Sequence, residues 1–62
     1  MSNLKKMRVQ KLMTQAELSE KSGVSIRMIQ YYEQGAKDIK KGNVMAVLSL
    51  AEALGCDVRD II

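Results

Sequence analysis

Four residues in the middle of the chain have side chains suited to recognising the edges of nucleic-acid bases: Ile26, Arg27, Gln30 and Tyr31. An arginine can donate two parallel hydrogen bonds to O6 and N7 of guanine, and a glutamine can pair with adenine in a similar way. Isoleucine can contact the methyl group of thymine, and a tyrosine hydroxyl can bond to a phosphate or a base. These residue types predict base reading if one face of one element presents them together.

The sequence offers little for catalysis or for metal binding. It contains no histidine and a single cysteine, Cys56, which excludes an intrachain disulfide and an ordinary zinc site. There is no glycine-rich phosphate loop, and Ser25 and Tyr31 have no base with which to form a nucleophilic pair. We therefore expect no enzymatic activity, no cofactor and no metal. We interpret Cys56 as a small apolar side chain, with redox sensing as the alternative.

Charge is distributed unevenly along the chain. The net charge is +3, but residues 1–41 contain nine Lys or Arg against four acids, whereas residues 42–62 contain one against three. This asymmetry favours a polyanionic partner, although a mixed solvated surface gives similar totals. A lone cysteine, the absence of a long apolar run and the polar N-terminus favour the cytoplasm over secretion or a membrane.

The base-reading side chains need a rigid element, and local signals predict where such elements lie. Thr14 and Glu17 have the spacing of a capping box, which begins a helix that Gly23 ends. Ser25 is a good N-cap for the next helix. Together with the apolar spacing elsewhere, these signals predict an all-α fold without strands. The five expected helices cover about residues 3–11, 15–22, 26–33, 43–54 and 58–61.

The apolar positions predict which side chains face inward. They are Leu18 in the second helix, Val24 just past the turn, and Ile29 and Tyr32 in the third helix. The fourth helix has an apolar stripe that consists of Val44, Val47, Leu48, Ala51 and Leu54. With Ile29 and Tyr32 inward, the outward face of the third helix presents Ile26, Arg27, Gln30 and Tyr31. Two short helices joined by a turn containing one glycine are typical of a helix-turn-helix, here over residues 15–34.

The segment from Thr14 to Ser25, followed by Ile29, Tyr32, Glu33 and Gly35, resembles the helix-turn-helix of the Cro and lambda-repressor type (the XRE family). Residues 4–8 and 50–62 resemble its first and last helices. The resemblance implies a five-helix, lambda-repressor-like bundle over residues 1–62, with base contacts at Ile26, Arg27 and Tyr31. Leu12 departs from the glycine that is frequent there, and residues 38–41 lengthen the connection to the fourth helix.

Further contacts are expected with the phosphate backbone of DNA. The free backbone N–H groups at the N-terminus of the second helix can bind a phosphate, and Gln15 at this position adds a side-chain donor. In the family, the matching glutamine often contacts both a phosphate and the recognition helix. Ordinary solvated roles remain the alternatives for these side chains and for Arg27. The full set of expected backbone contacts is Gln15, Ser25, Lys37, Lys40 and Lys41. The resemblance also implies a structural ion pair between Arg8 and Glu33.

The expected function is sequence-specific binding of double-stranded DNA by a transcriptional regulator, acting as a repressor through operator occupancy. The alternatives are a protein-interaction module on the same fold and the DNA-binding part of a longer regulator or antitoxin, since the sequence ends within an apolar turn. We also expect a weak homodimer on a palindromic site, with Val58 and Ile61 inward and Leu48 and Ile62 available to the partner. No membrane and no small-molecule ligand is expected.

Overall fold

The computed structural model describes residues 2–62, which form four α-helices, two short 3₁₀ turns and no strand. The elements in chain order are α1 (Asn3–Gln10), α2 (Gln15–Ser22), α3 (Ile26–Gln34), η1 (Ile39–Lys41), α4 (Val44–Leu54) and η2 (Val58–Asp60). The expectation of a fifth helix over residues 58–61 was wrong. Hydrogen bonds spanning three residues, such as Ile61 N–H to the Val58 carbonyl at 3.1 Å, make this segment a 3₁₀ turn instead.

Side-chain caps explain where the helices begin. The capping box of α2 is complete: Glu17 N–H donates to Thr14 Oγ1 and Thr14 N–H donates to Glu17 Oε1, both at 3.0 Å. The bond from the Thr14 backbone lowers the pKa of the Glu17 carboxyl. At α3, Met28 N–H donates to Ser25 Oγ at 3.2 Å. At α4, the Asn43 side chain accepts from two backbone N–H groups.

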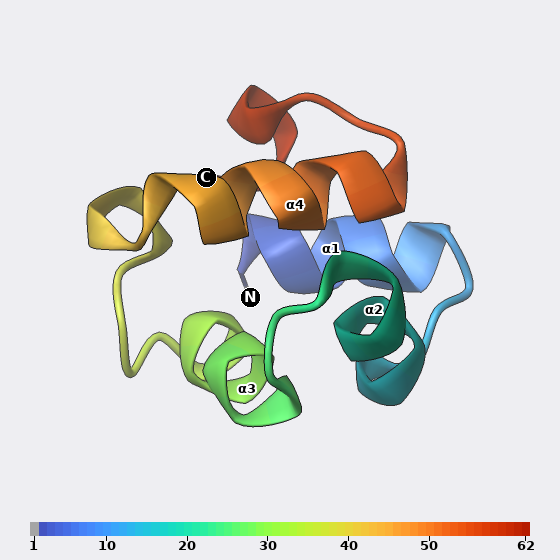
Figure 1. Ribbon diagram of the computed structural model, residues 1–62, viewed down its shortest axis with the longest axis horizontal. Coiled ribbons are helices and arrows are strands. Elements are labelled where there is room, and N and C mark those ends of the chain that lie inside the picture. The colour runs from blue at the N-terminus through green and yellow to red at the C-terminus, as the bar shows by residue number, and fades with distance from the viewer. Residues whose placement is uncertain (1) are drawn as a thin grey trace.

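Figure 1 shows α4 at the top, α1 beneath it in the view, and α2 and α3 at the bottom, and α4 packs mainly on α2. All four α-helices, the turn after α2 and the residue that follows η2 contribute to the core, which consists of Leu4, Leu18, Val24, Ile29, Tyr32, Val47, Leu50, Ala51, Leu54 and Ile61. The expected apolar stripe of α4 was wrong at Val44, which is 70% exposed, and Leu48 is 41% exposed, as its expected place on the outer side of the helix requires. The buried stripe consists of Val47, Leu50, Ala51 and Leu54, so Leu50 replaces the residues expected there.

Two turns on the α2 side of the molecule use the left-handed backbone region. Gly23 ends α2 with φ 76°, as the sequence predicts. Leu12, between α1 and α2, has φ 58° and a side chain that is 89% exposed. A side chain with a Cβ costs about 1–2 kcal/mol in this region, so the first turn keeps its geometry at the expense of strain.

The connection from α3 to α4 includes the 3₁₀ turn η1 and ends at Gly42. A Cβ added at Gly42 would overlap the hydroxyl of Tyr32, the buried tyrosine of α3. Only glycine therefore lets the chain pass this closely over α3. This contact fixes η1 and its lysines beside the C-terminal half of α3.

The described part of the chain has no helix long and apolar enough to cross a membrane. Within the same residues, no group of three or more acidic or sulfur side chains is placed to hold a metal ion. Cys56 is half-buried, and desolvation together with the nearby Asp60 carboxylate raises the pKa of its thiol. A thiol that stays protonated is a poor nucleophile, which favours the apolar interpretation of Cys56 over redox sensing.

Candidate nucleic-acid interface

The turn between α2 and α3 is held by hydrogen bonds from short side chains. Ser19 Oγ donates to the Val24 carbonyl at 2.7 Å, and Val24 N–H donates to Ser22 Oγ at 3.1 Å. Val24 itself is buried and anchors the turn in the core. These bonds satisfy backbone groups between the helices, so the angle between α2 and α3 is fixed.

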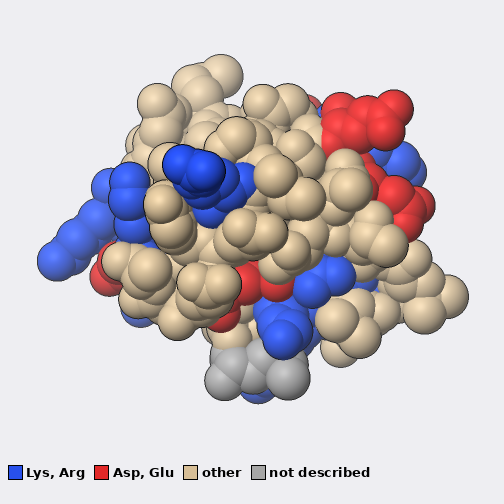
Figure 2. All heavy atoms as spheres, turned by 90° about the horizontal axis from the view of Figure 1, so that it is seen from below, with Lys and Arg blue, Asp and Glu red and all other residues tan. Residues whose placement is uncertain are grey.

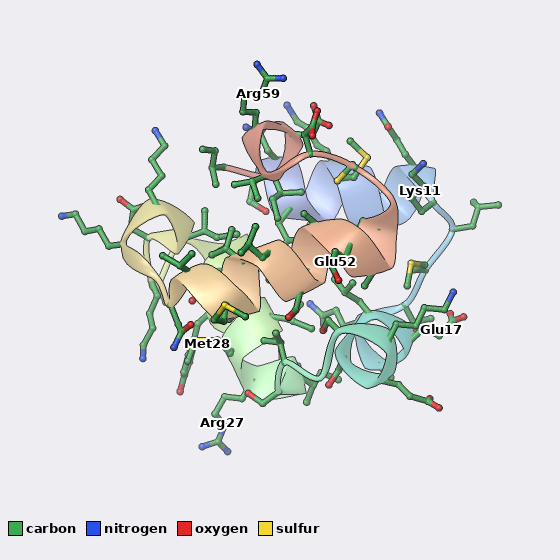
Figure 3. All side chains as sticks on the ribbon, turned by 45° about the horizontal axis from the view of Figure 1, so that its top comes forward. Lys11, Glu17, Arg27, Met28, Glu52 and Arg59 are labelled. Atoms are coloured by element: carbon green, nitrogen blue, oxygen red, sulfur yellow. The ribbon has the colours of Figure 1, made fainter. Side chains whose placement is uncertain are left out.

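The two sides of α3 have opposite surroundings. Ile29 is completely buried and Tyr32 nearly so, which attaches the helix to the core. Ile26 is 42% exposed, and Arg27 is exposed in the first turn of the helix. Figure 3 shows the Arg27 side chain extending away from the body of the protein. The start of α3 therefore presents an apolar and a cationic side chain to the outside.

Gln30 and Tyr31 lie one turn further along α3 and are half-buried. The Nζ atom of Lys37 lies 5.5 Å from the centre of the Tyr31 ring, within the range of a cation–π contact. The backbone N–H of Lys37 also donates to the Tyr31 carbonyl at 3.3 Å. The structure thus brings Lys37 to the end of α3.

Lys40 and Lys41 are exposed on η1. This turn begins at Asp38, whose side chain accepts a hydrogen bond from the Lys40 backbone at 3.0 Å. Lys37 and Lys41 line one hollow of about 410 Å³ between α3, η1 and the start of α4. Lys40 lines a different hollow, on the other side of η1. The three lysines therefore belong to one segment but not to one cluster.

Arg8 of α1 and Glu33 of α3 form a bidentate ion pair that joins the two helices. Arg8 Nε donates to Glu33 Oε2 at 2.7 Å, and Arg8 Nη2 donates to Glu33 Oε1 at 3.0 Å. Arg8 Nη1 also donates to the Met13 carbonyl at 2.8 Å, beyond the Leu12 turn. The hydrogen bond to Glu33 raises the pKa of the Arg8 guanidinium, against the opposing effect of desolvation. One side-chain cluster therefore joins α1, its following turn and α3.

Gln15, at the first position of α2, extends this cluster. Its Nε2 donates to Glu33 Oε1 at 3.0 Å, and its Oε1 accepts from Gln30 Nε2 at 3.4 Å. The contact between Gln15 and α3 agrees with what the family resemblance implies. The contact with Gln30 was not predicted, because no local pattern relates two side chains across the turn.

Charged side chains are unevenly placed on the face to which α2 and α3 both contribute. Figure 2 shows this face from below, with much of the basic surface toward the left and centre and the largest acidic group at the upper right. Figure 3 places Glu17 of α2 far from Arg27 of α3. The α3 end of this face therefore suits a polyanion better than the opposite edge does.

A capped helix, a tight turn on Gly23 and a second helix with an exposed polar face define a helix-turn-helix domain. The model of the Helix-turn-helix family of the XRE, or Cro and lambda-repressor, type matches residues 4–61, and the chain belongs to this family of DNA-binding transcriptional regulators. No match was found among curated proteins or among solved structures.

Proposed function

We propose that this chain binds one class of duplex DNA site by placing α3 in the major groove, and that it represses transcription by occupying that site. One observation carries this proposal: Ile26 and Arg27 are exposed at the start of α3 while Ile29 and Tyr32 fix the helix from behind. Side chains near the N-terminus of the recognition helix are those that reach base edges in this class of motif.

Each side chain of the recognition face, defined as Gln15, Ile26, Arg27, Gln30 and Tyr31, has a proposed role. Arg27 donates to O6 and N7 of a guanine, and Gln30 pairs with an adenine. Ile26 packs against a thymine methyl group. Tyr31 donates its hydroxyl to a phosphate or a base, and Gln15 contacts a phosphate with its remaining N–H. Ser25 Oγ accepts from Met28, which leaves its own proton free for a phosphate.

The lysines near η1 are proposed as a second group of phosphate contacts. Lys37, Lys40 and Lys41 follow α3 directly and are all exposed. Contacts of this kind fix the position of the protein on the duplex and carry no sequence information directly. Occupancy of the site then suffices for repression, since a bound protein excludes other proteins from the same DNA.

We further propose that two copies of the chain bind a palindromic site and contact each other through the C-terminal groove. This groove is defined by Ile39, Lys40, Gly42, Val44, Val47, Leu48, Val58 and Ile62. The groove has a volume of about 360 Å³ and consists mainly of aliphatic side chains, with Leu48 and Ile62 41% and 38% exposed. The Cα positions extend over 25 × 20 × 19 Å, so two adjoining copies can span half-sites about 34 Å apart. Because the patch is small, the dimer forms mainly on DNA.

Selection of bound sequences from random duplex DNA tests the proposed function. We expect one motif to be enriched, and binding to mixed-sequence DNA to weaken steeply with salt because phosphate contacts release counterions. A protein-interaction module on the same fold would enrich no motif. Absence of enrichment together with salt-independent binding would contradict the proposal.

A further inference from the structure

The C-terminal groove is a hollow whose size suits a small molecule. Its volume of about 360 Å³ lies within the range of about 300–1,000 Å³ that is typical of ligand sites. We infer that the groove binds an aliphatic carboxylate, which competes with the second copy of the chain and thereby releases the domain from a palindromic site. The inference rests on the proposed function, because it adds a regulator to the surface proposed for the dimer.

The groove is assembled from segments that are separate in the sequence. Its lining residues come from η1, from Gly42, from α4 and from η2 with the C-terminal residue. A small-molecule site was not expected from the sequence, because only the packing of α4 against η2 brings these segments together. The groove is therefore a product of the tertiary fold, and no local motif marks it.

The lining of the groove is aliphatic. Val47 is buried and Val58 is half-buried, whereas Val44, Leu48 and Ile62 are 70%, 41% and 38% exposed. Apolar surface of this kind gains free energy when an apolar group covers it. The lining contains no aromatic ring on which a flat ligand could stack. A flexible aliphatic chain consequently fits the groove better than an aromatic ring system does.

Lys40 determines which charge the ligand should carry. Among the described residues that line the groove, it is the only charged one, and it is exposed. Within residues 2–62 it forms no ion pair. The nearest acid in the sequence, Asp38, accepts a hydrogen bond from the Lys40 backbone and lines the hollow on the other side of η1. The Lys40 ammonium therefore favours an anionic ligand in the groove.

An aliphatic chain that ends in a carboxylate matches both features. The chain covers the exposed aliphatic walls, while the carboxylate stays hydrated at the rim beside the Lys40 ammonium. A single lysine matches the single negative charge of a carboxylate. A phosphate monoester carries about 1.5 to 2 negative charges at neutral pH and would lack a second cation here. The groove thus favours a carboxylate over a phosphate as the polar end of the ligand.

Such a ligand opposes DNA binding in two ways. Its chain covers Leu48 and Ile62, which are proposed dimer contacts, and its carboxylate neutralises Lys40, which is a proposed phosphate contact. At saturation, affinity for a palindrome should fall by roughly tenfold or more. The slope of log affinity against log salt should fall by about one, for the lost phosphate contact. A single half-site should respond less, because only the second effect applies to it.

Titration calorimetry of the free chain with octanoate, below the concentration at which octanoate forms micelles, tests the site directly. Octanoate should bind saturably, with one molecule per chain. It should bind more tightly than octanol, which has the same chain without a charge, and more tightly than octylamine, which has the opposite charge. Amide chemical shifts should change mainly in η1, α4 and η2. Equal affinity for all three probes, or no saturation, would show adventitious binding only and overturn the inference.

Two matched pairs of variants locate the ligand. Lys40→Met removes the ammonium from the groove, so octanoate affinity should fall by about threefold while octanol affinity stays the same. Lys41→Met removes the same charge from the other side of η1 and should change neither affinity. Val44→Glu adds an acid to the groove wall and should make octylamine the preferred probe. Met45→Glu alters the next position, which is 69% exposed and lines a different hollow, and should leave octanoate preferred.

An equal loss of octanoate affinity in Lys40→Met and Lys41→Met would overturn the inference, because binding would then report total charge. Unchanged affinity for a palindrome in the presence of saturating octanoate would do the same. Circular dichroism shows whether each variant is folded, and Lys40→Met serves if Val44→Glu is not. Octanoate binding by a chain that fails to bind duplex DNA in a salt-dependent way would instead contradict the proposed function.

Discussion

The recognition face and the C-terminal groove lie on one small domain, yet their side chains are held by different forces. On the recognition face, Gln15 and Gln30 belong to a directional network that ends in Arg8 and Glu33, both nearly buried. In the groove, Val44, Leu48 and Ile62 are exposed aliphatic side chains without hydrogen-bonding groups. The first surface can distinguish donors from acceptors, whereas the aliphatic part of the second can only bury apolar area.

This difference suits the recognition face to base recognition and the C-terminal groove to dimer formation. Polar groups give specificity because a mismatched partner leaves a donor or an acceptor without a bond. Apolar surface is indifferent to sequence and gains free energy from any complementary apolar partner. In the proposed complex, one surface would read the sequence of a palindromic operator and the other would provide the two-fold symmetry.

The largest expected effect concerns the ion pair behind the recognition face. Arg8→Ala leaves the Glu33 carboxylate in a nearly dry site with Gln15 as its remaining partner, so the free energy of unfolding should fall by about 3–5 kcal/mol. Urea denaturation measures this loss. The control is Arg59→Ala, since the Arg59–Asp57 pair is exposed at 87% and 74% and such pairs contribute about 0–1 kcal/mol. Similar losses in both variants would contradict the buried network.

A substitution in the C-terminal groove is expected to change DNA affinity rather than the free energy of unfolding. Leu48→Gln should lower affinity for a palindrome by roughly tenfold while affinity for a single half-site stays unchanged, because only the dimer contact is altered. Gel shifts on one and two half-sites measure both quantities. Val9→Gln changes another exposed aliphatic residue, on α1, and should leave the affinities for the palindrome and for the half-site unchanged. Equal affinity of the unmodified chain for a half-site and a palindrome would contradict the dimer.

The lysines of η1 should affect all DNA sequences alike. Replacing Lys40 and Lys41 with alanine should reduce the slope of log affinity against log salt by up to about two, roughly one for each lost phosphate contact. Titrations at several salt concentrations give the slope. The same change at Lys5 and Lys6, also exposed but on α1, should have a smaller effect. An equal reduction in both variants would mean that the slope reports total charge rather than contacts.

A substitution at Leu12 is expected to change the free energy of unfolding without changing which bases are preferred. Leu12→Gly should raise the free energy of unfolding by up to about 1 kcal/mol, because relief of left-handed strain exceeds the entropy that glycine adds to the unfolded chain. Thermal unfolding measures the gain. Base preferences should not change, since the Leu12 side chain is almost fully exposed and lies outside the Gln15 network. A loss of stability would show that the exposed leucine contributes a contact.

Local signals in the sequence predict the recognition unit closely. Thr14, Glu17 and Gly23 define the ends of α2 because capping and left-handed glycine depend only on neighbouring residues. Ser25 marks the start of α3 for the same reason. The exposure of the α3 face follows from helical periodicity, whereas the bases contacted by Arg27 remain a prediction.

Features set by tertiary packing were not predictable in the same way. Val44 and Leu48 satisfy a helical apolar stripe, but the orientation of α4 on α2 buries Leu50 instead. The 3₁₀ geometry of residues 58–60 depends on how Ile61 packs into the core. The contact between Gln15 and Gln30 depends on the angle between α2 and α3, which no single segment specifies.

The most direct measurement of the central claim compares two exposed arginines on opposite sides of the molecule, Arg27 on α3 and Arg59 on η2 (Figure 3). Both substitutions by alanine remove one positive charge, so they change total charge equally. On duplexes varied one base pair at a time, Arg27→Ala should cost about 1–3 kcal/mol on the best site and relax the preference at one pair. Arg59→Ala should leave affinity and preference unchanged. Equal losses in both variants, or a loss in Arg27→Ala that is uniform across all sequences, would contradict base reading by α3.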